Sequence, residues 1–277
     1  MQNADFDYNW SRCWPDQYLS PVLKLARLVA RCREPGCLRF FGGFCLLVFS
    51  GAFGEEADAV VAQFSVAADG VPPSSWAITA LRNRTPAEFR IVREGDIGVI
   101  QAHADASAGA LVHALNINPA EYPILDWRWQ IDNHIPESNM RTRAGDDFPA
   151  RVYVTFTVDK NELSLGDRLR LQVARLFYGV DLPAAAICYV WDRELPIGTA
   201  MPNAYSSNVM MVVAESGGPT PSGWVNERHN LRADYERFFG GPAPAVSSVI
   251  LAVDTDDTGA QATARFGDIR FMRGPTE

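Results

Sequence analysis

Residues 151–158 read RVYVTFTV, and this stretch decides the fold class. Val152, Val154 and Phe156 alternate with polar or amphipathic side chains, of which Arg151 is the first. A period of two places successive side chains on opposite faces of a β-strand. One face of this strand is apolar, and the other carries arginine, tyrosine and threonine. The stretch therefore predicts a strand with one face in a hydrophobic core.

The same alternation recurs along most of the chain. It predicts strands at 60–66, 76–81, 89–93, 98–104, 110–117, 124–131, 185–191, 209–214, 224–231, 248–253 and 262–272. Helical spacing is confined to 164–178 and a short turn at 234–239, and neither sits in a βαβ series. We therefore expect an all-β fold, an antiparallel two-sheet sandwich of jelly-roll (galactose-binding-like) type with one or two short helices.

Composition excludes two broad classes of protein. The chain has 277 residues, with 33 acidic and 25 basic side chains and a formal net charge of −8. A protein that tracks phosphates needs a basic face, so we expect no nucleic-acid partner. Hydrophobic residues make up 47% of the chain, which excludes wholesale disorder.

The first part of the chain resembles an export signal. The uncharged run 40–53, FFGGFCLLVFSGAF, follows three arginines. It is shorter than the roughly 20 residues of a membrane span. It has the length of a signal-peptide core, with Ala52 and Gly54 as small residues at the cut. We predict an N-terminal extension and signal peptide at 1–54, a single β-sandwich domain at 55–277, and a periplasmic or secreted product with no stable membrane span after cleavage. The alternatives are a short membrane anchor or a buried apolar segment.

Four aromatic residues are candidates for binding a ligand. In the segment DWRWQ, Trp127 and Trp129 share one strand face, and Tyr189 and Trp191 share another. If these faces are exposed, they form a platform on which sugar rings stack. The alternative is that the aromatic side chains fill the core, since tryptophan is highly buried on average.

Two adjacent acids lie on a predicted turn just before a strand that begins with arginine. Neighbouring carboxylates repel each other unless a cation or an arginine compensates them. Asp146, Asp147 and Arg151 therefore form either a cation or polyol site or a structural Asp–Arg bracket at the end of the sheet. The residues alone leave both readings open.

An aspartate-rich turn near the end of the chain is the candidate metal site. Asp254, Asp256 and Asp257 precede Gly259. Carboxylate oxygens are the ligands that Ca²⁺ prefers, although the spacing is not that of an EF-hand loop. The alternative is a hairpin turn whose aspartates cap their own backbone.

These segments together resemble a known family. The motifs LDWRW at 125–129, GDDFPARVYV at 145–154 and CYVWD at 188–192 are similar to those of a bacterial family of secreted proteins known as domain of unknown function 3047. The resemblance implies an exported β-sandwich, and it implies no activity. The tail, made of 254–259 and 266–269, is also similar to the last strand of jelly-roll carbohydrate-binding modules.

Three functions remain from the sequence. The first is a binding module for a glycan or polyol. The second is a glycoside hydrolase or lyase that uses paired aspartates, and the third is a purely structural envelope protein. No nucleophile elbow, metalloprotease motif or phosphate loop is found in the sequence, so we assign no catalytic residue and favour a binding protein over an enzyme.

Overall fold

The structure is a computed structural model that describes residues 58–80, 84–157, 185–217 and 223–274. These residues belong to one unit, Glu55–Glu277. The predicted signal peptide at 1–54 and the predicted helix at 164–178 lie outside the described residues. Among the described helices, none has the length and apolar character needed to cross a bilayer.

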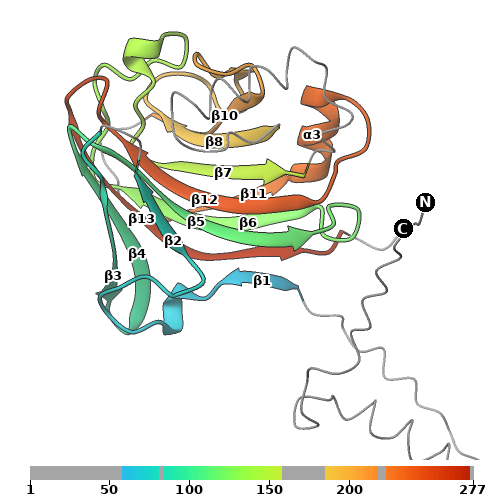
Figure 1. The fold of residues 1–277 in the computed structure, drawn as a ribbon, viewed down its shortest axis with the longest axis horizontal. Coiled ribbons are helices and arrows are strands. Elements are labelled where there is room, and N and C mark those ends of the chain that lie inside the picture. The colour runs from blue at the N-terminus through green and yellow to red at the C-terminus, as the bar shows by residue number, and fades with distance from the viewer. Residues whose placement is uncertain (1–57, 81–83, 158–184, 218–222, 275–277) are drawn as a thin grey trace, which may run out of the picture. The chain divides into compact units, whose positions relative to one another are not determined.

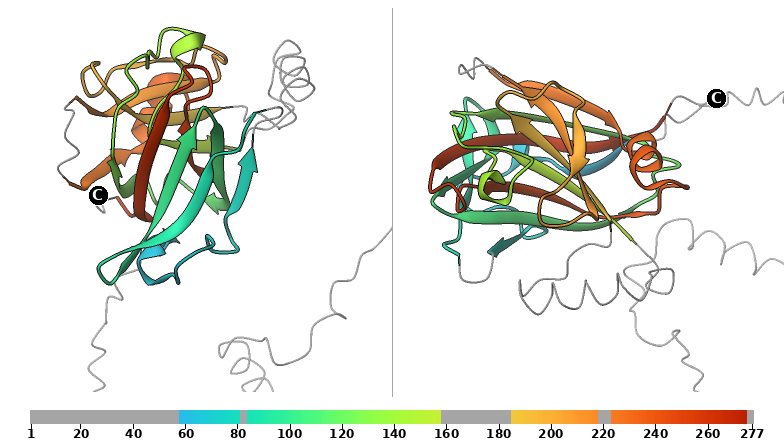
Figure 2. Two further views of the ribbon diagram at one scale, coloured as in Figure 1. Left: turned by 90° about the vertical axis from the view of Figure 1, so that its left-hand side faces the viewer. Right: turned by 90° about the horizontal axis from the view of Figure 1, so that it is seen from above.

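The described residues form two sheets whose inner faces share one core (Figure 1 and Figure 2). The six-stranded sheet has the order β11 (Val225–Asn230), β6 (Ile124–Ile131), β13 (Gln261–Met272), β4 (Ile97–Asp105) and β3 (Glu88–Glu94), with β1 (Ala59–Ala62) paired to β13. The seven-stranded sheet has the order β2 (Ala77–Ala80), β5 (Ala108–Ile117), β12 (Val246–Asp254), β7 (Arg151–Phe156), β8 (Ala186–Asp192), β10 (Val209–Ser216) and β9 (Ala200–Pro202). This architecture confirms the predicted two-sheet sandwich.

The structure corrects the strand prediction in three places. β10 pairs with β8 in parallel, because the chain between them returns to the end at which β8 begins before β10 starts. β9 was not predicted, since three residues carry no periodicity. The predicted strand at 60–66 stops at Ala62, and a 3-10 turn, η3 (Phe64–Val66), follows it. Phe64 turns inward there and packs against Trp76, with ring centroids 5.3 Å apart.

The packing of the core explains why apolar and polar residues alternate in the sequence. Along β6, buried and partly exposed residues alternate without exception, because one face packs on the opposite sheet. β8 is buried along its whole length. Its outer face carries Cys188, a free and buried thiol in a second apolar cluster with Met140 and Phe148.

The short predicted helix is present as α3 (Leu231–Phe239). The side chain of Asn230 caps it by accepting a hydrogen bond from Ala233 N. Gly240, with a φ of 73°, follows its last residue. Tyr235 packs against Phe156 of β7, with ring centroids 4.5 Å apart, so the helix covers one end of the sandwich.

Candidate functional site

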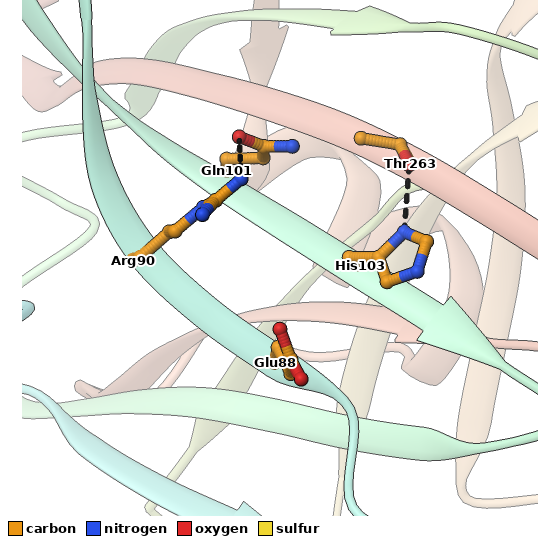
Figure 3. A pocket seen from close by; sticks show the side chains of 5 residues that line it. All are labelled: Glu88, Arg90, Gln101, His103 and Thr263. Atoms are coloured by element: carbon orange, nitrogen blue, oxygen red, sulfur yellow. Dashed lines mark hydrogen bonds between the residues drawn. The ribbon is translucent and has the colours of Figure 1, made fainter. Parts of the chain in front are cut away.

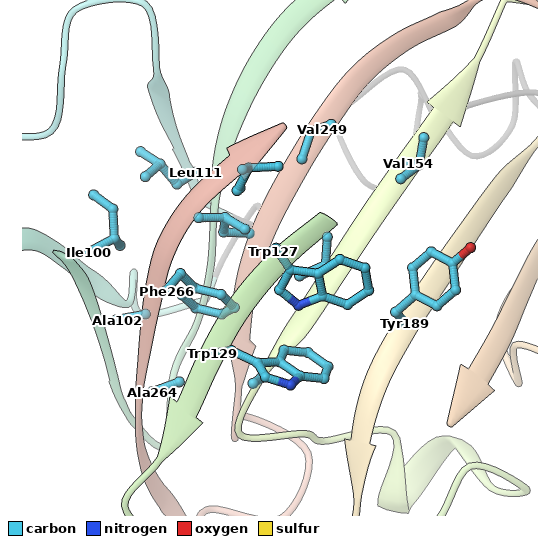
Figure 4. Close-up of a cluster of buried hydrophobic side chains, with 14 of the residues drawn as sticks. Ile100, Ala102, Leu111, Trp127, Trp129, Val154, Tyr189, Val249, Ala264 and Phe266 are labelled. Atoms are coloured by element: carbon cyan, nitrogen blue, oxygen red, sulfur yellow. The ribbon is translucent and has the colours of Figure 1, made fainter. Parts of the chain in front are cut away.

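The four candidate aromatic residues lie inside the sandwich. Figure 4 shows three of them, Trp127, Trp129 and Tyr189, among the buried side chains. Trp127 and Trp129 of β6 face Tyr189 and Trp191 of β8, with ring centroids 5.3 Å apart for Trp127 and Tyr189 and 5.7 Å apart for Trp129 and Trp191. Their exposed fractions are 2%, 0%, 0% and 6% in chain order. The predicted stacking platform is therefore wrong, because the shared strand face is the core face.

Polar groups at the edge of the sandwich complete this aromatic cluster. The indole Nε1 of Trp129 donates to Glu227 on β11 at 3.1 Å, and Tyr189 Oη donates to Asp234 on α3 at 2.7 Å. His229 lies 3.3 Å from Glu227 and stacks on Trp127. Burial raises the pKa of Tyr189 well above its usual value, and Asp234 adds to this rise. These contacts hold β11 and α3 against the core.

The predicted Asp–Arg bracket is present at the end of the seven-stranded sheet. Arg151 is buried, and its Nη1 lies 3.4 Å from Asp146 Oδ1 while its Nη2 lies 3.2 Å from Asp254 Oδ2. The guanidinium also donates to the backbone carbonyl of Asp146 and to Tyr153 Oη. Asn203 donates to the remaining oxygen of Asp146 at 2.9 Å. The structural interpretation of Asp146 and Arg151 thus accounts for their contacts.

The three aspartates of the predicted metal site do not lie together in the structure. Asp254 turns toward Arg151, and the pKa of its carboxyl group is raised by burial, while Arg151 opposes this rise. Asp147 takes its place beside Asp256 and Asp257, with one ligand atom of each within 4.8 Å of the others. Such oxygens suit a hard cation, so calcium remains a prediction with this changed ligand set.

The new acidic group already has partners in the protein. Asp147 Oδ2 accepts hydrogen bonds from the backbone N–H of Thr258 at 2.7 Å and from its hydroxyl at 2.6 Å. Arg84 Nε lies 2.6 Å from Asp256, and Tyr205 Oη donates to Asp257 at 2.7 Å. One arginine offsets one of three negative charges, so the group retains a net negative charge.

A polar pocket lies elsewhere, on the outer face of the six-stranded sheet (Figure 3). It has a volume of about 270 Å³. Neighbouring strands β3, β4 and β13 supply its lining residues, which are Glu88, Arg90, Gln101, His103 and Thr263. The register of the sheet aligns Glu88 with His103 and Thr263 in one row across the strands, and Arg90 with Gln101 in the next.

The pocket retains unused hydrogen-bonding capacity. His103 Nδ1 lies 2.9 Å from Thr263 Oγ1, and Arg90 donates to Gln101 Oε1 at 3.3 Å. The exposed carboxylate of Glu88 has no polar partner among the described residues. The pocket therefore presents a carboxylate, a guanidinium, an amide, an imidazole and a hydroxyl to solvent.

Sequence reasoning did not find this pocket. The signal in the sequence was a few alternating polar residues, Arg90 in the predicted strand at 89–93 and Gln101 and His103 in that at 98–104, which indicates only a solvated face. Thr263 lies 160 residues after His103, and only the pairing of β4 with β13 brings the two together.

The sequence was compared with known families. Residues 74–270 match the model of a family described as Protein of unknown function (DUF3047). The chain belongs to this family. The match includes all three motifs that carried the resemblance and all five residues of the pocket. None of the curated proteins matches the sequence.

Solved structures resemble this DUF3047 chain in fold. The Emp47p carbohydrate recognition domain is 10% identical with a TM-score of 0.43, over 79% of this chain and 96% of that one. The family 30 carbohydrate-binding module of a Clostridium thermocellum cellulosomal cellulase is 10% identical with a TM-score of 0.38, over 79% and 99%. A β-1,2-glucanase from Parabacteroides distasonis is 9% identical with a TM-score of 0.39, and the match covers 78% of this chain but only 25% of the glucanase. These matches concern the fold alone.

Proposed function

We propose that this protein is an exported binding module for glycans or small polyols. The observation that carries the proposal is the pocket on β3, β4 and β13, where five polar side chains converge on one cavity. Its volume of about 270 Å³ is close to the lower limit of about 300 Å³ for small-molecule sites. A single sugar ring or a polyol of similar size fits such a space.

The chemistry of the pocket suits hydroxyl groups. A hydroxyl both donates and accepts hydrogen bonds, so it needs donors and acceptors within reach. Glu88 supplies only acceptors and Arg90 only donors, while Gln101 supplies both. Paired hydroxyls on neighbouring carbons can bridge a carboxylate or a guanidinium in bidentate fashion.

The scaffold supports this role. All five side chains project from paired strands rather than from loops. A site on strands holds its geometry more exactly than one on loops, which lowers the entropy lost on binding. The predicted signal peptide at 1–54 supports export to a compartment where glycans are met.

The hydrolase or lyase alternative has less support. A glycosidase needs two carboxyl groups across the scissile bond, about 5–5.5 Å apart in retaining and 6.5–9.5 Å apart in inverting enzymes. The pocket is lined by a single carboxylate, Glu88. Asp146 and Asp147, the two adjacent acids, are buried and hydrogen-bonded within the protein. A purely structural envelope role predicts that no sugar binds in the pocket.

The test is binding of the purified full chain to a broad glycan array, followed by calorimetry on any hit. Glu88→Gln and His103→Ala should each weaken binding at least tenfold, since the first replaces the charged acceptor by a neutral amide and the second removes the imidazole from the cavity. Glu236→Gln is the matched control, because Glu236 is an exposed acid on α3, far from β3 in Figure 1. Equal affinity of Glu88→Gln and the control for the same sugar would place the site elsewhere.

A further inference from the structure

One side of the pocket adjoins an ion-pair network. Arg265 on β13 pairs with Gln101 in the sheet register, so its side chain stands next to the pocket. Its Nε lies 3.2 Å from Glu94 Oε1, and its guanidinium also contacts both carboxylate oxygens of Asp132. The donors of Arg265 are thus engaged by two carboxylates of the protein.

Glu94 carries this network across the whole face of the sheet. Its Oε2 accepts a hydrogen bond from Trp224 Nε1 at 2.8 Å. Glu94 ends β3 and Trp224 directly precedes β11, and these strands are the two edges of the sheet. In a flat sheet, strands four intervals apart are about 19 Å from each other. The sheet therefore curls toward its polar face, and the contact forms a Glu94–Trp224 bridge over that face.

The indole in this bridge is held in place. The guanidinium carbon of Arg128 lies 4.6 Å from the ring centroid of Trp224. Arg128 in turn lies directly on Gly267 of β13, where any Cβ would collide with its side chain. The bare backbone at this position lets Arg128 lie flat beneath Trp224, and the cation–π contact fixes one end of the bridge.

The pocket differs from this paired region because some of its hydrogen-bond donors and acceptors are not used within the protein. Glu88 has no polar partner among the described residues, and the second ring nitrogen of His103 has only a 3.5 Å approach to Gln261. Unused donors and acceptors thus gather at the Glu88 end. Moving toward β11, a ligand meets carboxylates and arginines that are already paired, and then the bridge.

We infer that the pocket takes the end unit of a glycan chain, or a free monosaccharide or polyol of that size, and does not take an internal stretch of a chain. This inference rests on the proposed function and names the ligand class of the same site. The bridge closes the route along the sheet face, and a cavity of about 270 Å³ holds one ring. A chain can then leave the pocket only in directions away from the bridge, which a terminal unit permits.

The test compares chain length and chain ends. Linear gluco-, manno- and galacto-oligosaccharides of one to six units are titrated into the purified full chain, each with free ends, with one end blocked and with both ends blocked. We expect a Kd that stays constant within twofold from two to six units, and a loss of at least tenfold when the recognised end is blocked. A Kd that falls with each added unit, or binding of chains blocked at both ends, would overturn the end-unit inference and leave the binding module standing. If no sugar binds in these titrations or on the glycan array, both the end-unit inference and the proposed binding function are overturned.

Variants of the bridge test its part directly. Glu94→Ala removes both contacts of the carboxylate, and Trp224→Phe removes the N–H donor while retaining a smaller aromatic ring. Each should leave monosaccharide binding within twofold and strengthen hexasaccharide binding several-fold, because the route along the face opens. Glu236→Ala on α3 is the control. An unchanged length profile in both folded variants would show that the bridge does not set the limit.

Discussion

Arg151 of β7 and Asp254 at the end of β12 form an ion pair with Nη2 and Oδ2 3.2 Å apart, and the arginine is only 2% exposed. The same guanidinium contacts the carboxylate of Asp146 in the segment that precedes β7. One cation thus joins three parts of the chain at the end of the sheet. Its removal leaves two carboxylates without a positive partner inside the protein.

Replacing Arg151 by methionine should destabilise the fold strongly. Breaking a buried ion pair from one side costs about 3–5 kcal/mol, because the remaining charge is uncompensated. Urea unfolding of the purified variant measures this loss. Arg232→Met is the control, since Arg232 forms an exposed pair with Glu236 that is worth at most about 0.5 kcal/mol. A loss below about 1 kcal/mol for Arg151→Met would show that the bracket is dispensable.

Asp254 should make stability depend on pH. Burial raises the pKa of its carboxyl group, Arg151 opposes the rise and Asp256 adds to it. The folded state therefore holds the proton more tightly than the unfolded chain, where aspartate has a pKa of about 3.9. The stabilisation is complete below that pH and is lost as pH rises through the folded pKa.

Asp254→Asn stays neutral at every pH and isolates this effect. Relative to wild type, the variant should gain free energy of unfolding as pH rises from about 4 to 7. Urea titrations at several pH values measure the difference. Asp69→Asn is the control, because Asp69 is an exposed acid 3.8 Å from Arg93. A difference for Asp254→Asn that stays constant over this range would refute the raised pKa.

Trp127 should behave as a core residue in mutagenesis. It is 2% exposed and packs against Trp129, Tyr189 and His229. Truncation of such a side chain to alanine costs about 3–5 kcal/mol. The partly exposed Trp224, on the outer face of the sheet, is the control, and Trp224→Ala should cost less than half as much. Equal losses in chemical denaturation would contradict the assignment of Trp127 to the core.

Calcium should stabilise the protein through Asp147, Asp256 and Asp257. Their ligand atoms lie within 4.8 Å of one another, a span that two oxygens on one Ca²⁺ cover at about 2.3–2.6 Å each. An ion that binds only the folded state raises Tm, here by a few degrees at millimolar Ca²⁺ for a site of moderate affinity. Thermal unfolding in Ca²⁺ and in chelator measures the shift, which Asp257→Asn should abolish and Asp69→Asn should preserve. Identical Tm values for the wild type in both buffers would exclude the site.

The sequence predicted the strands whose own residues alternate between the core and the opposite face. β6 and β7 were found because one face of each is in the core, which imposes a period of two. The same period put Trp127 and Trp129 on one face but did not say which face meets solvent. That choice depends on the second sheet, and the indoles turned out to fill the core.

Features built from distant segments were beyond such reasoning. Asp147 joins Asp257 across 110 residues, and this displaced Asp254 from the predicted metal triad. The pocket needs the register of β13 against β4, and the parallel pair of β8 and β10 needs a return of the chain that no local pattern encodes. The sequence showed which polar residues lie close together along the chain, and it did not show which distant residues they contact.

The place of β13 constrains how the protein is made. Among the described strands it comes last along the chain, yet it lies between β4 and β6 and also pairs with β1. A nascent chain that has not yet reached residue 261 leaves β4 and β6 without the strand that joins them, and long-range strand pairing is slow to form. The six-stranded sheet therefore closes only after β13 has been synthesised, long after its neighbours β4 and β6.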